Sequence, residues 1–361
     1  MLKPALFALV SLTAIFWRWR APLKNTRARI GQTLLCVFAV LCLLGLVGWF
    51  YMVRMPGESF TGTPNSADES FHAKQARLEA DVAHLSLTIG ERNVTRSPQA
   101  LTDAAMFVRQ RFVDLGYKVS RQEFETSGIT CMNLSVEILG ASKPDEIIVV
   151  GAHYDSVPGT PGANDNASGT AALLELARAC VNRKPDRTLR FVAFTNEEPP
   201  HFQRPTMGSL IYAKRCKQRD ENIVAAISLE TIGFFSDMRG SQQYPPPFGL
   251  VYPSKGNFIG IVGDMNSRSL VHQVVSAFRE TAEIPSEGGA LPGVIQGVGW
   301  SDHWSFWQCG YRGVMITDTA PFRYAYYHRA EDTPDKLDFR RMTRVVSALP
   351  AVLQELAGHN P

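Results

Sequence analysis

The sequence predicts an α/β fold in which a mixed, mostly parallel central sheet carries helices on both faces, preceded by an N-terminal transmembrane helix. Short apolar runs, among them 147–150 and 223–229, have the length and composition of buried strands. Segments with apolar residues at helical spacing alternate with these runs, which indicates parallel strands joined by helices. Residues 30–53 contain no charged side chain and are dominated by Leu, Val, Cys, Phe and Gly.

The uncharged segment 30–53 is long enough to cross a bilayer as a helix, and the aromatic residues 49–51 near its end favour a membrane interface. Basic residues between 18 and 29 precede it, so the positive-inside rule places the rest of the chain on the periplasmic or extracellular side. The earlier apolar stretch 4–17 is ambiguous between a second span, a re-entrant piece and a surface helix, so the anchor is single-pass or two-pass. A cleaved signal peptide is the alternative. It is disfavoured because the apolar run is long and no small-residue cleavage site follows it cleanly.

Three regions are therefore expected: a membrane anchor over 1–53, a linker over 54–74 that is rich in Gly, Ser, Thr and Pro, and a globular domain over 75–361. Helices are predicted from near Gln75 and over 97–115, 168–181 and 340–356. Strands are predicted over 118–125, 132–139, 147–150, 189–194, 223–229, 259–262 and 314–316.

The composition bounds the class of function. The formal net charge of +3 over 361 residues is too small to predict nucleic-acid binding. The six cysteines form no CxxC pair, so a thiolate zinc site is not expected. With 45% hydrophobic residues the chain can bury a sizeable core, but nothing in the sequence predicts its oligomeric state.

Histidine and carboxylate side chains gather just after the predicted strands or in the loops near them. They are His153, Asp155, Asp165, Glu197, Glu198, Glu230 and His328. Because the carboxyl ends of strands in an α/β sheet border the crevice in which ligands bind, we expect these side chains to meet there. Two histidines and three carboxylates, without a thiolate, suit zinc or another first-row divalent ion.

The expected ligands are His153, Asp165, Glu198, Glu230 and His328. Five ligands are more than one catalytic zinc uses. A carboxylate that bridges two ions would account for the excess. Glu197 would then be free, next to a ligand, to act as a general base.

These motifs resemble the zinc-dependent peptidases that include secreted bacterial leucyl aminopeptidases, glutamate carboxypeptidase and, more distantly, glutaminyl cyclases. The resemblance covers roughly residues 77–356, and its motifs occur in the family's order. They are Ile89-Gly90-Glu91-Arg92, His153-Tyr154-Asp155-Ser156, the loop 162–169, Asn196-Glu197-Glu198, Ser301-Asp302-His303, and His328 with Asp332-Thr333.

The resemblance implies two zinc ions per chain. His153 and Glu230 would hold one, Glu198 and His328 the other, and Asp165 would bridge both, with a cis peptide bond after it. Asp155 would accept the second ring N–H of His153 and orient the imidazole. The resemblance also implies a metallo-aminopeptidase that cleaves N-terminal residues from peptides with a free N-terminus, using a metal-bridging water activated by Glu197. Residues 75–361 would be its catalytic domain, anchored to the lipid bilayer by the N-terminal helix.

Two departures from the family are visible. Members commonly supply a Tyr oxyanion donor shortly before the Ser-Asp-His motif, and residues 297–300 contain none. His303 or a Tyr from 324–327 are the substitutes in this sequence. The segment 199–207 is longer than the family's usual link, and we expect it to border the active site and narrow the substrate range.

Two other functions remain open within the same fold. One is a single-zinc glutaminyl-peptide cyclase-like enzyme, and the other is a non-catalytic receptor-like member that has lost ligands. The presence of His153 and of Asn196-Glu197-Glu198 argues against the cyclase, and the complete ligand set argues against the receptor.

Overall fold

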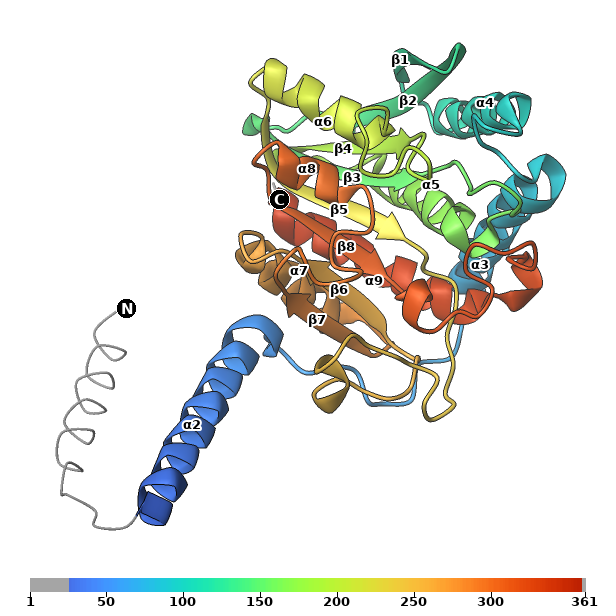
Figure 1. Cartoon of the computed structure of the whole chain (residues 1–361). Helices are drawn as coiled ribbons and strands as arrows, with labels where there is room; N and C mark the ends of the chain where they lie inside the picture. Colours follow the sequence, from blue (N-terminus) through green and yellow to red (C-terminus); the bar gives the residue numbers. More distant parts are fainter. Residues whose placement is uncertain (1–25, 359–361) are drawn as a thin grey trace. The chain divides into compact units, whose positions relative to one another are not determined.

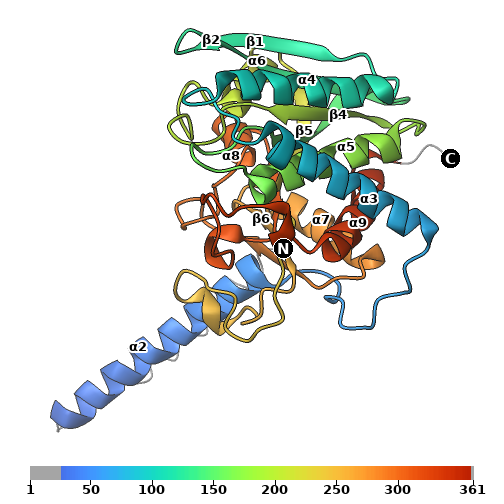
Figure 2. The ribbon, with the colours of Figure 1, turned by 90° about the vertical axis from the view of Figure 1, so that its right-hand side faces the viewer.

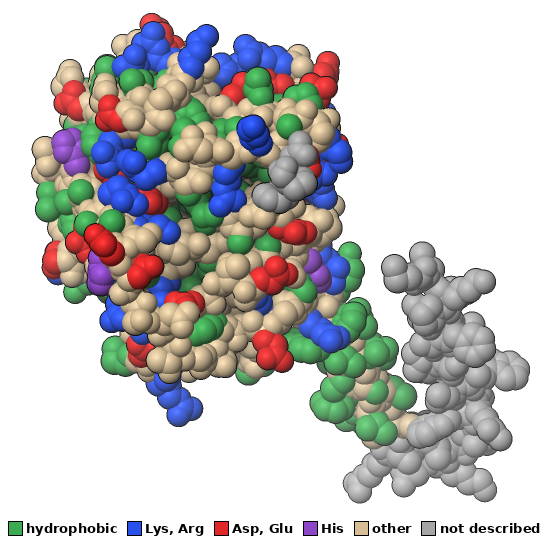
Figure 3. Space-filling view, turned by 180° about the vertical axis from the view of Figure 1, so that it is seen from behind, with side chains coloured by type: hydrophobic (Ala, Val, Ile, Leu, Met, Phe, Trp, Pro, Cys, Tyr) green, Lys and Arg blue, Asp and Glu red, His purple; other side chains and the backbone are tan. Residues whose placement is uncertain are grey.

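The computed structural model describes residues 26–358, and the chain divides into two compact units between Tyr51 and Met52. The first unit contains helix α2 (Thr26–Gly48), which the π-helical turn η1 (Trp49–Val53) continues. Within the segment Ile30–Val53 an 18-residue window reaches a mean hydropathy of 2.5, and none of that window is buried. Hydrophobic side chains cover the helix surface (Figure 3). The length and composition fit a membrane span and fit a signal sequence equally well. The stretch 4–17 lies outside the described residues.

The second unit is built on one eight-stranded sheet with the order β1-β2-β4-β3-β5-β8-β6-β7 (Figure 1). Strands β4, β3, β5 and β8 run parallel in the centre, β1 and β2 form an antiparallel edge, and β6 runs antiparallel to β8 and parallel to β7. The strands are β1 (Ser120–Thr126), β2 (Ile129–Ile138), β3 (Lys143–His153), β4 (Arg187–Phe194), β5 (Asn222–Glu230), β6 (Ile259–Gly263), β7 (Ser286–Ala290) and β8 (Gly313–Thr317).

Helices cover both faces of this sheet, as the sequence predicts. The larger core lies under α3, α4, α5, α7 and α9, of which α3, α4 and α5 are seen face-on in Figure 2. The smaller core lies under α6 and α8. Strand β3 contributes side chains to both cores. Ile148 and Val150 lie in the larger core, and Ile147 and Val149 lie in the smaller one. The helices are α3 (Glu69–Ala83), α4 (Pro98–Asp114), α5 (Gly169–Cys180), α6 (Gly208–Gln218), α7 (Arg268–Thr281), α8 (His303–Gln308) and α9 (Phe339–Ala357).

The structure contains several elements that the sequence analysis did not predict, namely α6, α7, α8 and β7. Strand β7 has the sequence Ser-Glu-Gly-Gly-Ala, which lacks the β-branched and aromatic residues typical of strands. Helix α3 begins at Glu69, earlier than the periodicity from Gln75 suggests. Asp68 caps the helix, since its carboxylate accepts a hydrogen bond of 2.7 Å from the Phe71 N–H.

Candidate metal centre

The site forms where the central parallel strands end. His153 is the last residue of β3, Glu230 is the last residue of β5, and Glu197 and Glu198 follow β4 by three and four positions. Because neighbouring parallel strands end at the same edge of the sheet, their terminal side chains converge. Asp165 reaches this edge from the irregular turn η3 (Ala163–Ser168), which contains a cis peptide bond between Asp165 and Asn166.

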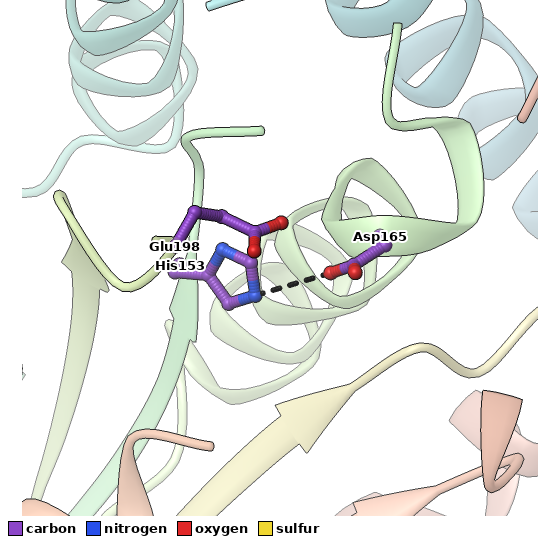
Figure 4. Close-up of side chains that lie close together, drawn as sticks. All are labelled: His153, Asp165 and Glu198. Carbon is purple, nitrogen blue, oxygen red and sulfur yellow. Dashed lines mark ion pairs between the residues drawn. The ribbon is translucent and has the colours of Figure 1, made fainter. Parts of the chain in front are cut away.

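The structure brings all five expected ligands together, in two groups that share Asp165. In the first group, His153 Nε2 lies 3.4 Å from Asp165 Oδ1 and 3.2 Å from Glu230 Oε2. In the second, His328 Nε2 lies 3.1 Å from Asp165 Oδ2 and 3.3 Å from Glu198 Oε2. The two oxygens of one carboxylate therefore face two different imidazoles. Figure 4 shows His153, Asp165 and Glu198, which point toward one another from three separate segments.

These spacings suit metal ions. Two ligand atoms that each lie about 2.0–2.1 Å from one ion in tetrahedral geometry are about 3.3 Å apart. The buried atoms His153 Nε2, Asp165 Oδ1 and Glu198 Oε1 also have no hydrogen-bond partner. Buried polar atoms are normally hydrogen-bonded, and bound cations would satisfy all three. The imidazole and carboxylate donors are those that zinc accepts.

The ionisation of these groups reflects their burial and crowding. Burial raises the pKa of Glu198 to about 7 and raises the pKa of Glu230 as well. Burial would also raise the pKa of Asp165, but the two imidazoles beside it hold the pKa below its ordinary value. For His328 burial acts to lower the pKa, and Asp165 and Glu198 override it and raise the pKa to about 11. Protons thus occupy the metal-free site.

Glu197 lies beside the ligands without joining either group. Its Oε2 is 3.9 Å from His153 Nε2, a longer approach than that of the expected ligands. Burial, together with the negative charges of Glu230 and Glu198, raises the pKa of Glu197 well above its usual range. The side chain is 7% exposed, so it is screened from bulk water but not sealed. A carboxylate placed in this way can accept a proton from a bound molecule.

Asp155 has a wider role than the sequence analysis anticipated. Its Oδ1 lies 3.5 Å from His153 Nδ1, which puts it beside the imidazole as expected. Its two oxygens also accept hydrogen bonds from the backbone N–H groups of Glu197 and Glu198, at 3.2 and 3.1 Å. One carboxylate therefore links the end of β3 to the loop after β4. The motif His-Tyr-Asp signals the first contact, but only the fold reveals the second.

Two further buried residues support the ligand loops. Asp332 accepts hydrogen bonds from the backbone N–H groups of Asn164 and Asp165. The guanidinium of Arg92 is fully buried and donates only to backbone carbonyls, including those of Tyr154 and Gly162 on either side of the loop before Asp165. Both residues belong to motifs that the sequence analysis singled out without giving them a role.

The metal centre opens into a pocket that the predicted loop borders. Pro199 and Phe202, from the segment 199–207, line it together with Trp300 and Tyr327. The Tyr327 ring stacks on His328 with ring centroids 3.9 Å apart. His303, the other substitute considered for the oxyanion donor, does not line this pocket and instead bonds Val298 O through Nε2 at 2.8 Å.

A mixed α/β sheet whose parallel strands end in a buried cluster of imidazole and carboxylate ligands, with a spare glutamate beside them, defines a metal-dependent hydrolase. The family model for peptidase family M28 matches residues 133–353, and the chain belongs to this family. It is a zinc-dependent metallopeptidase, in agreement with the resemblance of its motifs.

One curated protein is similar to the chain in sequence, and two solved structures share its fold. The uncharacterized protein YfbL of Escherichia coli (strain K12) is 35% identical over 291 residues, which cover 78% of this chain and 88% of YfbL. The structure of BSAP, a zinc aminopeptidase from Bacillus subtilis, is similar with a TM-score of 0.63 and 16% identity over 78% of this chain and 95% of BSAP. The glutaminyl cyclase of Fimbriiglobus ruber has a TM-score of 0.56 and 19% identity over 84% of this chain and 99% of the cyclase. At these identities the solved structures show the fold alone. The choice between an aminopeptidase and a glutaminyl cyclase must therefore be argued from the residues of the site.

Proposed function

We propose that the chain is a membrane-anchored aminopeptidase that holds two zinc ions and removes N-terminal residues from peptides. The observation that carries the proposal is the position of Asp165, whose Oδ1 faces His153 and whose Oδ2 faces His328. Each imidazole has its own second carboxylate, Glu230 or Glu198. Two complete ligand groups joined by one carboxylate favour two ions over one.

The bound ions would lower the pKa of a water molecule and polarise the peptide carbonyl. Glu197 takes the proton of the attacking water, because it lies beside both ligand groups and has a raised affinity for a proton. The same carboxyl then returns the proton to the leaving amine. Asp155 keeps Glu197 in place, because its carboxylate accepts a hydrogen bond from the Glu197 backbone N–H.

An oxyanion donor is the remaining requirement, and Tyr327 is the candidate. It lines the pocket of the metal centre, and the sequence provides no Tyr at 297–300. Burial, followed by the charges of Asp165, Glu198 and Glu230, raises the pKa of Tyr327, so its hydroxyl stays protonated and able to donate.

Action on free N-termini is supported by the charge of the site. Glu197, Glu198 and Glu230 all line or border the pocket, and an ammonium or amine group of a substrate would find an anionic partner among them. Membrane anchoring is supported by the exposed apolar surface of α2, and the basic residues before it favour placing the catalytic unit outside the cytoplasm.

A single-zinc cyclase is the second candidate, because a glutaminyl cyclase shares the fold. It would leave His153 and Glu230 without a role in metal binding, although they lie 3.2 Å apart at the site. A non-catalytic function would leave the whole ligand set without a purpose.

Zinc content and turnover of the full chain in detergent separate these candidates. Two zinc ions per chain with hydrolysis of aminoacyl-anilides supports the proposal. One zinc ion with cyclisation of an N-terminal glutamine, and without anilide hydrolysis, would replace it with the cyclase. Absence of bound zinc at saturating concentration would leave only the non-catalytic function.

A further inference from the structure

A second pocket adjoins the metal centre and has no role in the proposed mechanism. Three residues line both pockets, namely Glu230, Trp300 and Tyr327. The floor of the second pocket is the sheet face at β8, β6 and β7, with Met315, Thr317, Gly260 and Val262 among its residues. A substrate held at the metals could therefore extend one side chain into this pocket.

A row of four paired residues runs along this floor. Glu230 of β5 pairs with Thr317 of β8, Thr317 pairs with Gly260 of β6, and Gly260 pairs with Glu287 of β7. Paired residues of adjacent strands point to the same face, and adjacent strands are about 4.8 Å apart, so Glu287 lies about 14 Å along the sheet from Glu230. The two positions between them are Thr317 and Gly260, and both line the pocket, so the floor between the two glutamates carries no charged side chain.

The walls of the pocket are aromatic. The rings of Tyr244 and Tyr252 stack with centroids 5.6 Å apart, and the Phe248 ring lies 6.3 Å from that of Tyr252. Both Tyr hydroxyls are already engaged, because they donate to the backbone carbonyls of Pro253 and Gly288. These walls therefore offer ring faces to a ligand rather than free hydroxyl groups.

Glu287 is the acidic group at the far end of this apolar pocket. Within residues 26–358 it forms no salt bridge. The positive charge of Arg279 on α7 acts to lower the pKa of Glu287, but the two side chains form no ion pair. The Arg279 guanidinium donates hydrogen bonds to Ser286 and to the carbonyls of Pro56 and Gly57. Burial raises the pKa of Glu287, and burial together with the Glu287 charge raises the pKa of Tyr252, which places the carboxylate close to the ring walls.

We propose that this pocket receives the side chain of the substrate's N-terminal residue and selects lysine or arginine, whose apolar stem lies on the pocket floor and whose cation meets the Glu287 side chain. A cation at this end would gain the carboxylate as a partner and the faces of Tyr244 and Tyr252 as cation–π contacts. The methylene stem of either residue would cover part of the apolar floor, and the Glu287 side chain, which lines the same pocket, would extend toward the cation over the rest of the row. The inference rests on the proposed aminopeptidase function and names its substrate class.

The test compares lysyl- and norleucyl-anilides on the zinc-loaded full chain in detergent, since norleucine shares the apolar stem of lysine and lacks the ammonium. We expect kcat/KM to favour lysine by at least tenfold, and Glu287→Gln to reduce that ratio at least tenfold. Glu287→Lys should shift preference toward glutamyl-anilide. The matched control is Glu280→Gln, an exposed glutamate on α7 outside the pocket, which should leave the ratio unchanged.

A binding measurement tests the selectivity of the pocket independently of the proposed aminopeptidase activity. L-lysinol and L-norleucinol carry the amine and side chain but no scissile carbonyl, so calorimetry reports the pocket without turnover. Lysinol should bind at least tenfold more tightly, and Glu287→Gln should remove the difference. Equal affinities, or a lysine preference that survives Glu287→Gln, would overturn the inference. Failure to hydrolyse any anilide would instead count against the aminopeptidase, while the two alcohols still decide the pocket's selectivity.

Discussion

The carboxylate of Asp332 accepts a hydrogen bond of 3.1 Å from the backbone N–H of Asp165, although 167 positions separate the two residues. The other Asp332 oxygen accepts from the Asn164 N–H at 2.8 Å and from the Tyr324 hydroxyl at 2.8 Å. Asp332 thus holds the backbone of Asp165, the bridging ligand that we propose, in place. Ligands supported in this way lose metal affinity when the supporting group is removed.

Replacement of Asp332 by Asn should weaken zinc binding by about 10- to 100-fold. The amide nitrogen of Asn would face one of the two backbone N–H groups that donate to the Asp332 carboxylate in the wild type, and it cannot accept that hydrogen bond. A chelator competition assay measures the change. Asp335→Asn, in the same loop but exposed and bonded only to Lys336 and Thr333, serves as the control and should keep wild-type affinity. Equal zinc affinity in Asp332→Asn and wild type would contradict the support that we assign to Asp332.

Replacement of Glu197 by Gln should lower kcat by about 10²–10⁴-fold and leave zinc content unchanged, because the amide keeps the shape of the side chain and cannot accept the water proton. Metal analysis and anilide hydrolysis on one preparation give both quantities. Glu198→Gln is the informative comparison, since a ligand variant should lose zinc as well as turnover. Full activity of Glu197→Gln would remove the general base from the mechanism.

Tyr327→Phe should reduce kcat by about 10²–10³-fold with a smaller effect on KM, which is the signature of a donor that acts on developing negative charge. Stacking of the Phe ring on His328 would be retained. The neighbouring Tyr326→Phe provides a control, because Tyr326 does not line the metal pocket. If kcat is the same in Tyr327→Phe and wild type, another group supplies the oxyanion donor.

Zinc uptake should release protons near neutral pH. A metal ion requires His328 without its Nε2 proton and Glu198 as a carboxylate, whereas in the metal-free chain the pKa of His328 is raised to about 11 and that of Glu198 to about 7. Between pH 7 and pH 11 the metal-free site holds at least the His328 proton, which zinc must displace, so the affinity for zinc rises with pH. Below about pH 7 Glu198 is protonated as well, and the affinity for zinc falls further. Calorimetric titration in two buffers of different ionisation enthalpy should give different apparent enthalpies, and identical values would refute the proton release.

The sequence was sufficient to predict the centre of the fold and the convergence of the ligands. Apolar runs such as 147–150 are buried on both faces, so their strand character is visible in composition alone. The helices at 98–114 and 339–357 lie within a residue or so of their predicted bounds, because amphipathic periodicity and flanking signals agree there.

Other features depend on contacts that no local pattern encodes. Strand β7 forms because Ser286–Ala290 pairs with β6, not because Gly-rich segments favour strands. The double role of Asp155 depends on β3 and β4 lying side by side in parallel. The position of Glu287 in the row from Glu230 depends on the register of β5, β8, β6 and β7, whose order in the sheet differs from their order in the sequence.

Arg92 provides a positive charge beneath the acidic centre that does not depend on the supply of metal. Burial lowers its pKa only to about 10, and Asp155, Asp332, Asp165 and Glu198 all act to raise it, so it stays charged across the physiological range. Its backbone partners cannot titrate away, and the charge cannot diffuse as a solvent ion would. The chain therefore supplies its own counter-ion to the buried carboxylates, and this charge is present with or without metal.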